Sequence, residues 1–247
     1  MFKLLLLAGL SCVFSTLSFA SSFTNIVVPG TANIQTANGN IDPATCCNSN
    51  GPSTQAVLAL TFAAGANQVL TFSNIGGMVG CAGSLTNGAD GGCLPFHTSI
   101  SNLNGLSGIS TGFNANMFLV GVFTDDNVPV GPPPGTLNYT NPAAFQLGDY
   151  TPYMALNRLF FIGDGLTGTG SGAVQTFGVP LGATRLYLGF ADSFNFQGSV
   201  DFYGDNVGAL TVNGSVNTVP EPGTLAVVPL GAAALWLFKR RKQTAAK

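Results

Sequence analysis

The stretch RLYLGF, residues 185 to 190, places a large apolar side chain at every second position. A period of two is typical of a strand that buries one face. The run ALTV, residues 209 to 212, shows nearly the same alternation, and further short apolar runs are bounded by Gly, Pro and Asn. We therefore predict strands over residues 56–62, 68–72, 117–123, 158–162, 174–179, 185–190 and 208–216.

The segments between these runs are rich in residues that end regular structure. SLTNGADGGC, residues 84 to 93, and VPVGPPPG, residues 128 to 135, contain Gly, Pro and Asn in combinations that a helix does not cross. Outside the two ends of the chain, no window has helical periodicity. Seven or more short strands separated by such turns predict an all-β fold, an antiparallel β-sandwich of jelly-roll type.

The first 20 residues have the pattern of a secretory signal peptide. Lys3 precedes an apolar stretch over residues 4–14, and Ser18 and Ala20 provide small residues at a cleavage site. We therefore expect an N-terminal signal helix over residues 1–20, removed after Ala20. A lipoprotein signal at Cys12 is the alternative, but the residues before Cys12 lack the aliphatic residue that such a site requires.

The expected exported part, residues 21–218, is strongly acidic. Its basic residues are Arg158 and Arg185, and nine Asp side chains give a net charge of about −7 with His97 neutral. A surface of this charge repels phosphate backbones, so we expect no nucleic-acid partner. Its length of almost 200 residues is enough for one domain with a sizeable core.

Four cysteines remain after loss of the signal peptide, and an even number in an exported chain favours two disulfides. A bridge between the neighbours Cys46 and Cys47 is strained and rare, so we expect each to pair with either Cys81 or Cys93. A zinc site is the alternative. The spacing has no CxxC pair and the chain has a single His, which argues against zinc.

The sequence contains no catalytic motif. It lacks GxSxG and HExxH, and His97 has no neighbouring base or nucleophile. With no Glu before Glu221, a paired-carboxylate glycosidase is also not indicated. Gly163, Gly165 and Gly168 match GxGxxG, but a loop and a strand follow where a nucleotide site needs a helix. We therefore expect a protein that is not an enzyme.

Two acidic clusters follow predicted strands, one at residues 125–127 and one at residues 205–206. Loops at strand ends that carry Asp and Asn supply the oxygen ligands that Ca²⁺ prefers. The same residues also form Asx turns, in which the side chain accepts a backbone hydrogen bond two residues on. Neither cluster has EF-hand spacing, so each one taken alone favours the turn.

The C-terminal stretch VPEPGTLAVVPLGAAALWLFKRRK, residues 219 to 242, resembles the PEP-CTERM sorting signal of Gram-negative bacteria. The Pro-Glu-Pro triplet, an apolar segment and a basic cluster follow in the family's order at the end of the chain. The resemblance implies an exosortase-type membrane protease as partner, cleavage near the triplet, and release to the cell surface or extracellular matrix. The family's recognition motif corresponds to Pro220, Glu221 and Pro222.

The apolar part of this signal, residues 225–238, is short for a permanent anchor. A helix of 14 residues spans about 21 Å, against a hydrocarbon core of roughly 30 Å. We expect a short transmembrane helix within residues 219–247, with the basic tail on the cytoplasmic side. We expect this helix to hold the precursor in the membrane only until cleavage. The alternative is that the helix is retained as a permanent single-span anchor.

Residues 116–216 resemble a domain found in many PEP-CTERM proteins and are similar to small bacterial calcium-dependent galactose-binding lectins, which are β-sandwiches. In those lectins an Asp that closes a strand and a later Asn-rich loop bind calcium, and the calcium binds sugar hydroxyls. The matching runs here are LYLGFAD and YGDNVGA. The resemblance implies a calcium site at Asp192, Asp205 and Asn206, with the backbone carbonyl of Phe202 and a further backbone ligand at Gln35.

This chain departs from the lectin pattern in the connecting loop. It inserts SFNFQGSVDF, residues 193 to 202, Asp205 replaces an Asn, and Val207 replaces a Ser. Asp201 of the insertion can join the site. We expect exposed aromatic rings from this region, namely Phe194, Phe196 and Tyr203, to contact a ligand.

These features predict a noncatalytic carbohydrate-binding or matrix-interaction protein, exported and located at the cell surface or in an extracellular polysaccharide. Calcium is the expected cofactor, if there is one. The alternative is a structural matrix protein with no ligand site, in which the Asp residues form turns and the Phe residues fill the core.

Overall fold

The computed structural model describes residues 20–85, 87–112, 115–141 and 147–219. Within these residues the chain is built almost entirely of β-strands, with short 3₁₀ turns as its helical elements. The all-β prediction is therefore confirmed. The expected signal helix, the Pro-Glu-Pro motif at residues 220–222 and the short transmembrane helix lie outside the described residues. Among the residues described, no helix has both the length and the apolar character needed to cross a membrane.

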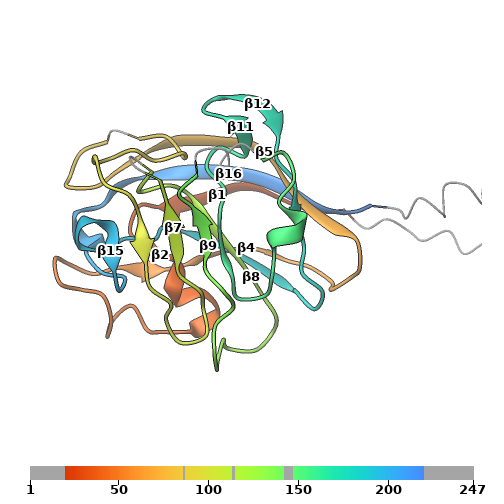
Figure 1. The fold of residues 1–247 in the computed structure, drawn as a ribbon, viewed down its shortest axis with the longest axis horizontal. Coiled ribbons are helices and arrows are strands. Elements are labelled where there is room, and N and C mark those ends of the chain that lie inside the picture. Colours follow the sequence, from red (N-terminus) through yellow and green to blue (C-terminus); the bar gives the residue numbers. More distant parts are fainter. Residues whose placement is uncertain (1–19, 86, 113–114, 142–146, 220–247) are drawn as a thin grey trace, which may run out of the picture.

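Two four-stranded antiparallel sheets form the body of the molecule. In the first, the central strands β16 and β5 pair from Val207↔Gly80 to Thr218↔Gln68. Figure 1 shows β1, β16 and β5 running lengthwise along one side of the molecule. The first sheet has the order β1 (Ser21–Pro29), β16 (Val207–Thr218), β5 (Gln68–Gly80) and β13 (Phe177–Gly178). The second has the order β10 (Leu159–Phe161), β8 (Val120–Thr124), β14 (Arg185–Gly189) and β4 (Val57–Thr61).

Among the described residues, three smaller units accompany the two main sheets, and two of them contain parallel pairs that the sequence did not predict. The first has the order β15 (Gln197–Gly198), β6 (Ser99–Ile100), β7 (Ile109–Thr111) and β9 (Leu137–Tyr139), with β15–β6 and β7–β9 parallel. The second is the parallel pair β2 (Ala32–Asn33) and β3 (Thr54–Gln55). The third is the hairpin β11 (Leu166–Gly168) and β12 (Ser171–Val174), which stands out at the top of Figure 1.

Aromatic side chains join the two main sheets. The ring of Phe160 on β10 lies 5.3 Å from that of Phe177 on β13, so the second sheet contacts the first. The ring of Phe177 also lies 5.8 Å from that of Phe72 on β5, and the ring of Phe160 lies 5.3 Å from that of Phe123 on β8. All four rings are buried, and ring pairs of this kind add about 0.5–1.5 kcal/mol each beyond their area burial. This aromatic core fixes the strands on which the candidate site is built.

The strands end where the sequence places turn residues, and the glycine motif is one example. Gly163 and Gly165 lie in the turn between β10 and β11, both with positive φ, and a strand follows. The prediction that this motif lies in a turn is confirmed. The 3₁₀ elements of the described residues also lie in connections between strands, namely η1 (Ile34–Gly39), η3 (Thr151–Tyr153), η4 (Phe194–Phe196) and η5 (Tyr203–Asp205).

Candidate functional site

The segments after β14 and before β16 bring Asp192 and Asn206 together. The Asn206 side-chain amide donates to Oδ2 of Asp192 over 2.7 Å and to the carbonyl of Gly30 over 3.2 Å. Oδ1 of Asp192 accepts from the backbone N–H of Ser193 over 2.7 Å. Both side chains are buried, with 3% and 6% exposed. Two of the residues implied by the lectin resemblance are thus in direct contact.

The hydroxyl of Tyr203 bonds backbone groups and a side chain next to this pair. It accepts from the backbone N–H of Asp192 over 3.1 Å. The same oxygen lies 3.1 Å from Oδ1 of Asn33 and 3.0 Å from the carbonyl oxygen of Phe190. The hydroxyl has one proton, which it donates to one of these two acceptors. The side chain is fully buried. The expectation of an exposed, ligand-contacting Tyr203 is therefore wrong, because its hydroxyl ties η5 to β2 and to the end of β14.

A pocket of about 200 Å³ lies beside the Asp192–Asn206 pair. Its walls include both carboxylates implied by the resemblance, Asp192 and Asp205, together with residues of η4 and of the loop that follows β5. A ligand in this space would therefore meet two acidic groups and an aromatic rim. The residues that matter for this argument are Cys81, Asp192, Ser193, Phe194, Phe202 and Asp205.

The three aromatic residues expected to be exposed differ in their surroundings. Phe194 is 63% exposed, and its ring lies 5.2 Å from that of Phe202. Phe196 is only 2% exposed, so the expectation of exposure is wrong for this residue also. Phe196 packs into the core because it follows Asn195, whose φ of 52° turns the chain back toward the body. Phe194 remains as an aromatic side chain available to solvent at the pocket.

Gln35 and Asp201 are held elsewhere. The backbone carbonyl of the buried Gln35 accepts from the Asn40 side chain over 3.0 Å, and the Gln35 side chain donates to the carbonyl of Ser107 over 2.9 Å. Gln35 is not among the described residues that line the pocket. The Asp201 carboxylate accepts from the backbone N–H of Ser49 over 2.9 Å and also from its hydroxyl. Burial raises the pKa of Asp201, but hydrogen bonds from Ser49 and Phe202 outweigh it and the net pKa is lowered. Asp201 is thus an ionised anchor for the Ser49 loop.

The Asp192 carboxyl has an unusual ionisation. Burial raises its pKa to about 7, against the lowering effect of hydrogen bonds from Asn206 and Ser193. The charges of Asp205 and Asp201 raise it further. A bound cation would favour the ionised form, because an opposite charge offsets the loss of hydration. The carboxyl is therefore a group whose charge responds to a cation and to pH near neutrality.

The oxygen atoms at this site fit a hard cation in part. Oδ1 of Asn206 is buried and has no hydrogen-bond partner among the described residues. Each carboxylate oxygen of Asp192 has a further lone pair beyond the bond that it accepts. Calcium takes six to eight oxygens, so two carboxylates, this amide oxygen and the Phe202 carbonyl would leave positions for other ligands. Across the described ranges, no three His, Cys, Asp or Glu side chains gather closely enough to hold a metal by themselves.

No family model, curated protein sequence or solved structure matches this chain. The PEP-CTERM and lectin resemblances therefore rest on the residues quoted for them. They stay predictions, and so does the role of each residue in ligand binding.

The disulfide pairing differs from the expected one. Cys46 bonds its neighbour Cys47, and Cys81 bonds Cys93. The expectation that Cys46 and Cys47 pair separately with the later cysteines is wrong, while the expectation of two bridges is confirmed. The physical reason is that the two pairs belong to different loops, which approach η5 at Gly204 and at Asp205 respectively.

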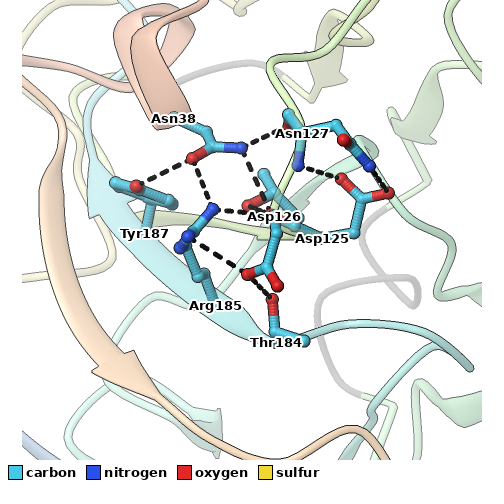
Figure 2. Close-up of polar contacts among 8 residues, drawn as sticks. Asn38, Asp125, Asp126, Asn127, Thr184, Arg185 and Tyr187 are labelled. Carbon is cyan, nitrogen blue, oxygen red and sulfur yellow. Dashed lines mark hydrogen bonds and ion pairs between the residues drawn. The ribbon is translucent and has the colours of Figure 1, made fainter.

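The second acidic cluster, at residues 125–127, forms a closed polar network and not an open site. The Asp125 carboxylate accepts from the backbone N–H of Asn127 over 2.9 Å and from its side chain over 3.1 Å, which confirms the predicted Asx turn. Asp126 pairs with Arg185 over 3.1 Å and accepts from Thr184 over 2.8 Å. Figure 2 shows these side chains turned toward one another around Arg185 and Asn38. Sequence reasoning missed Asn38.

Asn38 is the residue that completes this network. Its Oδ1 accepts from Arg185 over 3.0 Å and from the Tyr187 hydroxyl over 3.2 Å, and its Nδ2 donates to the carbonyls of Asp125 and Asn127. Its φ of 55° lies in the left-handed region, which Asn tolerates better than most residues. The network therefore fastens η1 to β8 and β14, and its polar groups are used within the protein.

Proposed function

We propose that this chain is an exported protein of the PEP-CTERM class, processed by an exosortase-type membrane protease and located at the surface or in the extracellular matrix of a Gram-negative bacterium. The signal-peptide pattern at residues 1–20 and the ordered features of residues 219–247 support this. The acidic, lysine-free composition of residues 21–218 suits a surface that does not bind nucleic acid.

Its molecular role is noncatalytic carbohydrate binding at the pocket beside Asp192. The observation that carries this proposal is that Asp192, Asp205 and the exposed Phe194 line one pocket of about 200 Å³. In this proposal the two main sheets are the layers of a lectin-like β-sandwich. Calcium is bound by Asp192, Asp205, Asn206 and the Phe202 carbonyl, and sugar hydroxyls complete its ligand sphere.

Phe194 supplies the second part of the recognition. An aromatic ring exposed beside a polar site offers an apolar face to the C–H groups of a sugar ring, while the cation takes the hydroxyls. The ring of Phe194 packs against that of Phe202, with 5.2 Å between the ring centres. A ligand with adjacent hydroxyls on one side and a flat apolar face on the other fits this arrangement.

Calcium titration tests the proposal. Thermal unfolding is followed with calcium, with magnesium and with chelator, and calcium at about 100 times its Kd stabilises by about 2.7 kcal/mol. For a domain of this size that is a rise in Tm on the order of 5–10 °C. The shift should disappear in Asp205→Asn and persist in the control Asp125→Asn, whose carboxylate serves an Asx turn. A glycan array with and without chelator then identifies the sugar.

A structural matrix protein without a ligand site is the second candidate, and one observation favours it. Both oxygens of Asp192 already accept hydrogen bonds from the protein, and Phe196 and Tyr203 belong to the core. This candidate predicts the same Tm in calcium and in chelator, and no array signal from the wild-type protein.

A further inference from the structure

The segment η5, which carries Asp205, is held by a loop that contains the Cys46–Cys47 bridge. The Asp201 carboxylate accepts two bonds from Ser49, and the backbone N–H of Gly204 donates to Oδ1 of Asn50 over 3.0 Å. These are the side-chain contacts through which the loop of residues 42–53, here called the Cys46 loop, reaches the segment that forms the pocket wall.

The Cys46 loop also meets η5 through bare backbone. A Cβ on Gly51 would lie 2.9 Å from the Cα of Gly204, closer than real Cβ contacts come. Gly51 has a φ of 131°, so this position needs glycine for its conformation as well as for space. The backbones of Gly51 and Gly204 therefore stay in contact only while the Cys46 loop keeps its present conformation.

A second disulfide loop holds the other end of η5. The backbone N–H of Gly83 donates to the carbonyl of Asp205 over 2.8 Å, and Cys81 lines the pocket itself. Cys81 is bridged to Cys93, twelve residues further along the chain. The pocket segment is thus fixed between two loops, each containing one disulfide.

The two bridges differ in what they do for the fold. A bridge between residues twelve apart closes a loop and so restricts the unfolded chain, whereas a bridge between neighbours closes almost no loop. Opening Cys81–Cys93 therefore affects the whole domain, and opening Cys46–Cys47 acts locally. Cys81 is 6% exposed and its partner Cys93 is half-buried, whereas both cysteines of the adjacent bridge are half-buried.

The adjacent bridge also holds a backbone conformation that free cysteines would not favour. Cys47 has a φ of 69°, in the left-handed region that non-glycine residues rarely adopt. Consecutive Cα atoms are about 3.8 Å apart, less than the 4.4–6.8 Å usual for a disulfide, and departures of this kind make a bridge more reducible. Once the bond opens, nothing covalent keeps residues 46–47 in this turn.

We propose that Cys46–Cys47 is a redox modification site: a small dithiol reduces it, the Cys46 loop leaves η5, and ligand binding at the pocket weakens. The dithiol is oxidised to its cyclic disulfide, its two S–H bonds are lost, and the Cys46–Cys47 S–S bond becomes two thiols, with two electrons and two protons transferred. The effect on binding rests on the proposed function, whereas the release of η5 does not.

The experiment uses the full chain with both bridges formed. After graded exposure to dithiothreitol, free thiols are alkylated and mapped by mass spectrometry, and backbone hydrogen exchange is measured in parallel. We expect Cys46 and Cys47 to be alkylated first. In that state the Ser49 and Gly204 amides, which donate to Asp201 and Asn50, should exchange at least about tenfold faster, while those of β16 are unchanged.

Two variants separate the steps. Cys46→Ser/Cys47→Ser should show the fast exchange without any dithiol, and Asn50→Ala should speed the exchange of Gly204 with the bridge intact. Alkylation of Cys81 and Cys93 before Cys46 and Cys47, or unchanged Ser49 and Gly204 exchange once the adjacent bridge is open, would overturn the proposal.

Calcium and glycan binding are measured on the same samples. If the oxidised protein binds neither, the proposed function fails and the exchange result still decides whether the loop is released. If the oxidised protein binds and the protein with an open Cys46–Cys47 bridge binds equally well, then the bridge does not control ligand binding. The proposed function stands in that case. We expect at least about tenfold weaker binding in the reduced state.

Discussion

The side-chain amide of Asn206 donates to Oδ2 of Asp192 over 2.7 Å, and both side chains are shielded from solvent. This contact joins the residue that precedes β16 to the loop that follows β14. It places a carboxyl group with a raised pKa on the pocket wall, so protonation of this one side chain affects the stability of the fold.

Stability should fall as the pH rises from about 4 to about 7. Burial raises the pKa of Asp192 to about 7 in the folded state, against an ordinary value of 3.8, so over this range the unfolded chain loses the proton that the folded chain keeps. At 1.36 kcal/mol per unit, the loss is on the order of 4 kcal/mol, and it levels off above pH 7. Urea unfolding without calcium at several pH values measures it.

Asp192→Asn is the control for this pH effect. The variant has no titrating group at this position, so its free energy of unfolding should vary less with pH, whatever its absolute value. Asp90, whose pKa is also raised by burial, is retained in both proteins, so the difference in slope isolates Asp192. Equal slopes in the two proteins would show that Asp192 is ionised in the folded state from low pH.

Tyr203→Phe should lower the free energy of unfolding by about 1–3 kcal/mol. The change removes the acceptor for the buried N–H of Asp192 and leaves that group unsatisfied. Tyr187→Phe is the matched control, because its hydroxyl bonds Asn38 at a half-buried position, and its loss should be below about 1 kcal/mol. Equal losses in the two variants, read from urea unfolding curves, would contradict the role given to Tyr203.

Phe194 and Phe196 should respond oppositely to truncation. Phe196→Ala opens a cavity in the core and should cost about 3–5 kcal/mol of stability. Phe194→Ala removes an exposed ring, so stability should change by less than about 1 kcal/mol while sugar affinity falls severalfold. Calorimetric titration with the sugar found on the array measures the second effect. Unchanged affinity in Phe194→Ala would remove this ring from the recognition surface.

Asn38→Ala should destabilise the protein more than loss of the ion pair beside it. The Asn38 side chain bonds four groups and the residue has a φ of 55°, so alanine loses these bonds and strains the backbone, at about 2 kcal/mol or more. Asp126→Asn removes the charge of the exposed partner in the ion pair with Arg185 and should cost less than about 1 kcal/mol. Thermal unfolding at matched pH compares them, and the reverse order would refute the importance of Asn38.

The strands were predictable because their signal is local. Each of the seven predicted ranges overlaps a strand of the structure, and β14 at Arg185–Gly189 lies within the quoted stretch RLYLGF. Strand β1 was missed because a bulge between Phe23 and Ile26 breaks its alternation, with Asn25 at a φ of 55°. The short strands β6, β7 and β15 were missed because two or three residues are too few for a period to be recognised.

The site was only partly predictable, because long-range contacts decide which side chains are buried. Tyr203 is buried through a bond to Asn33, 170 residues earlier, and nothing in the run DFYGDN indicates it. The cysteine spacing likewise does not state which loops meet, and four cysteines allow three pairings. The resemblance to lectins led to Asp192 and Asn206, which the structure joins, and to the backbone of Gln35, whose carbonyl accepts from the Asn40 side chain in the structure.

The strand order also determines when the fold is completed. The last strand of the domain, β16, lies between the first strand, β1, and β5, with Ser21 opposite Val216. The first strand therefore has no partner in its sheet until the final residues of the domain emerge, and pairings that distant along a chain form slowly. The proposed function has the chain cross a membrane unfolded, and under that proposal this strand order would keep the first sheet incomplete until the whole domain had been translocated.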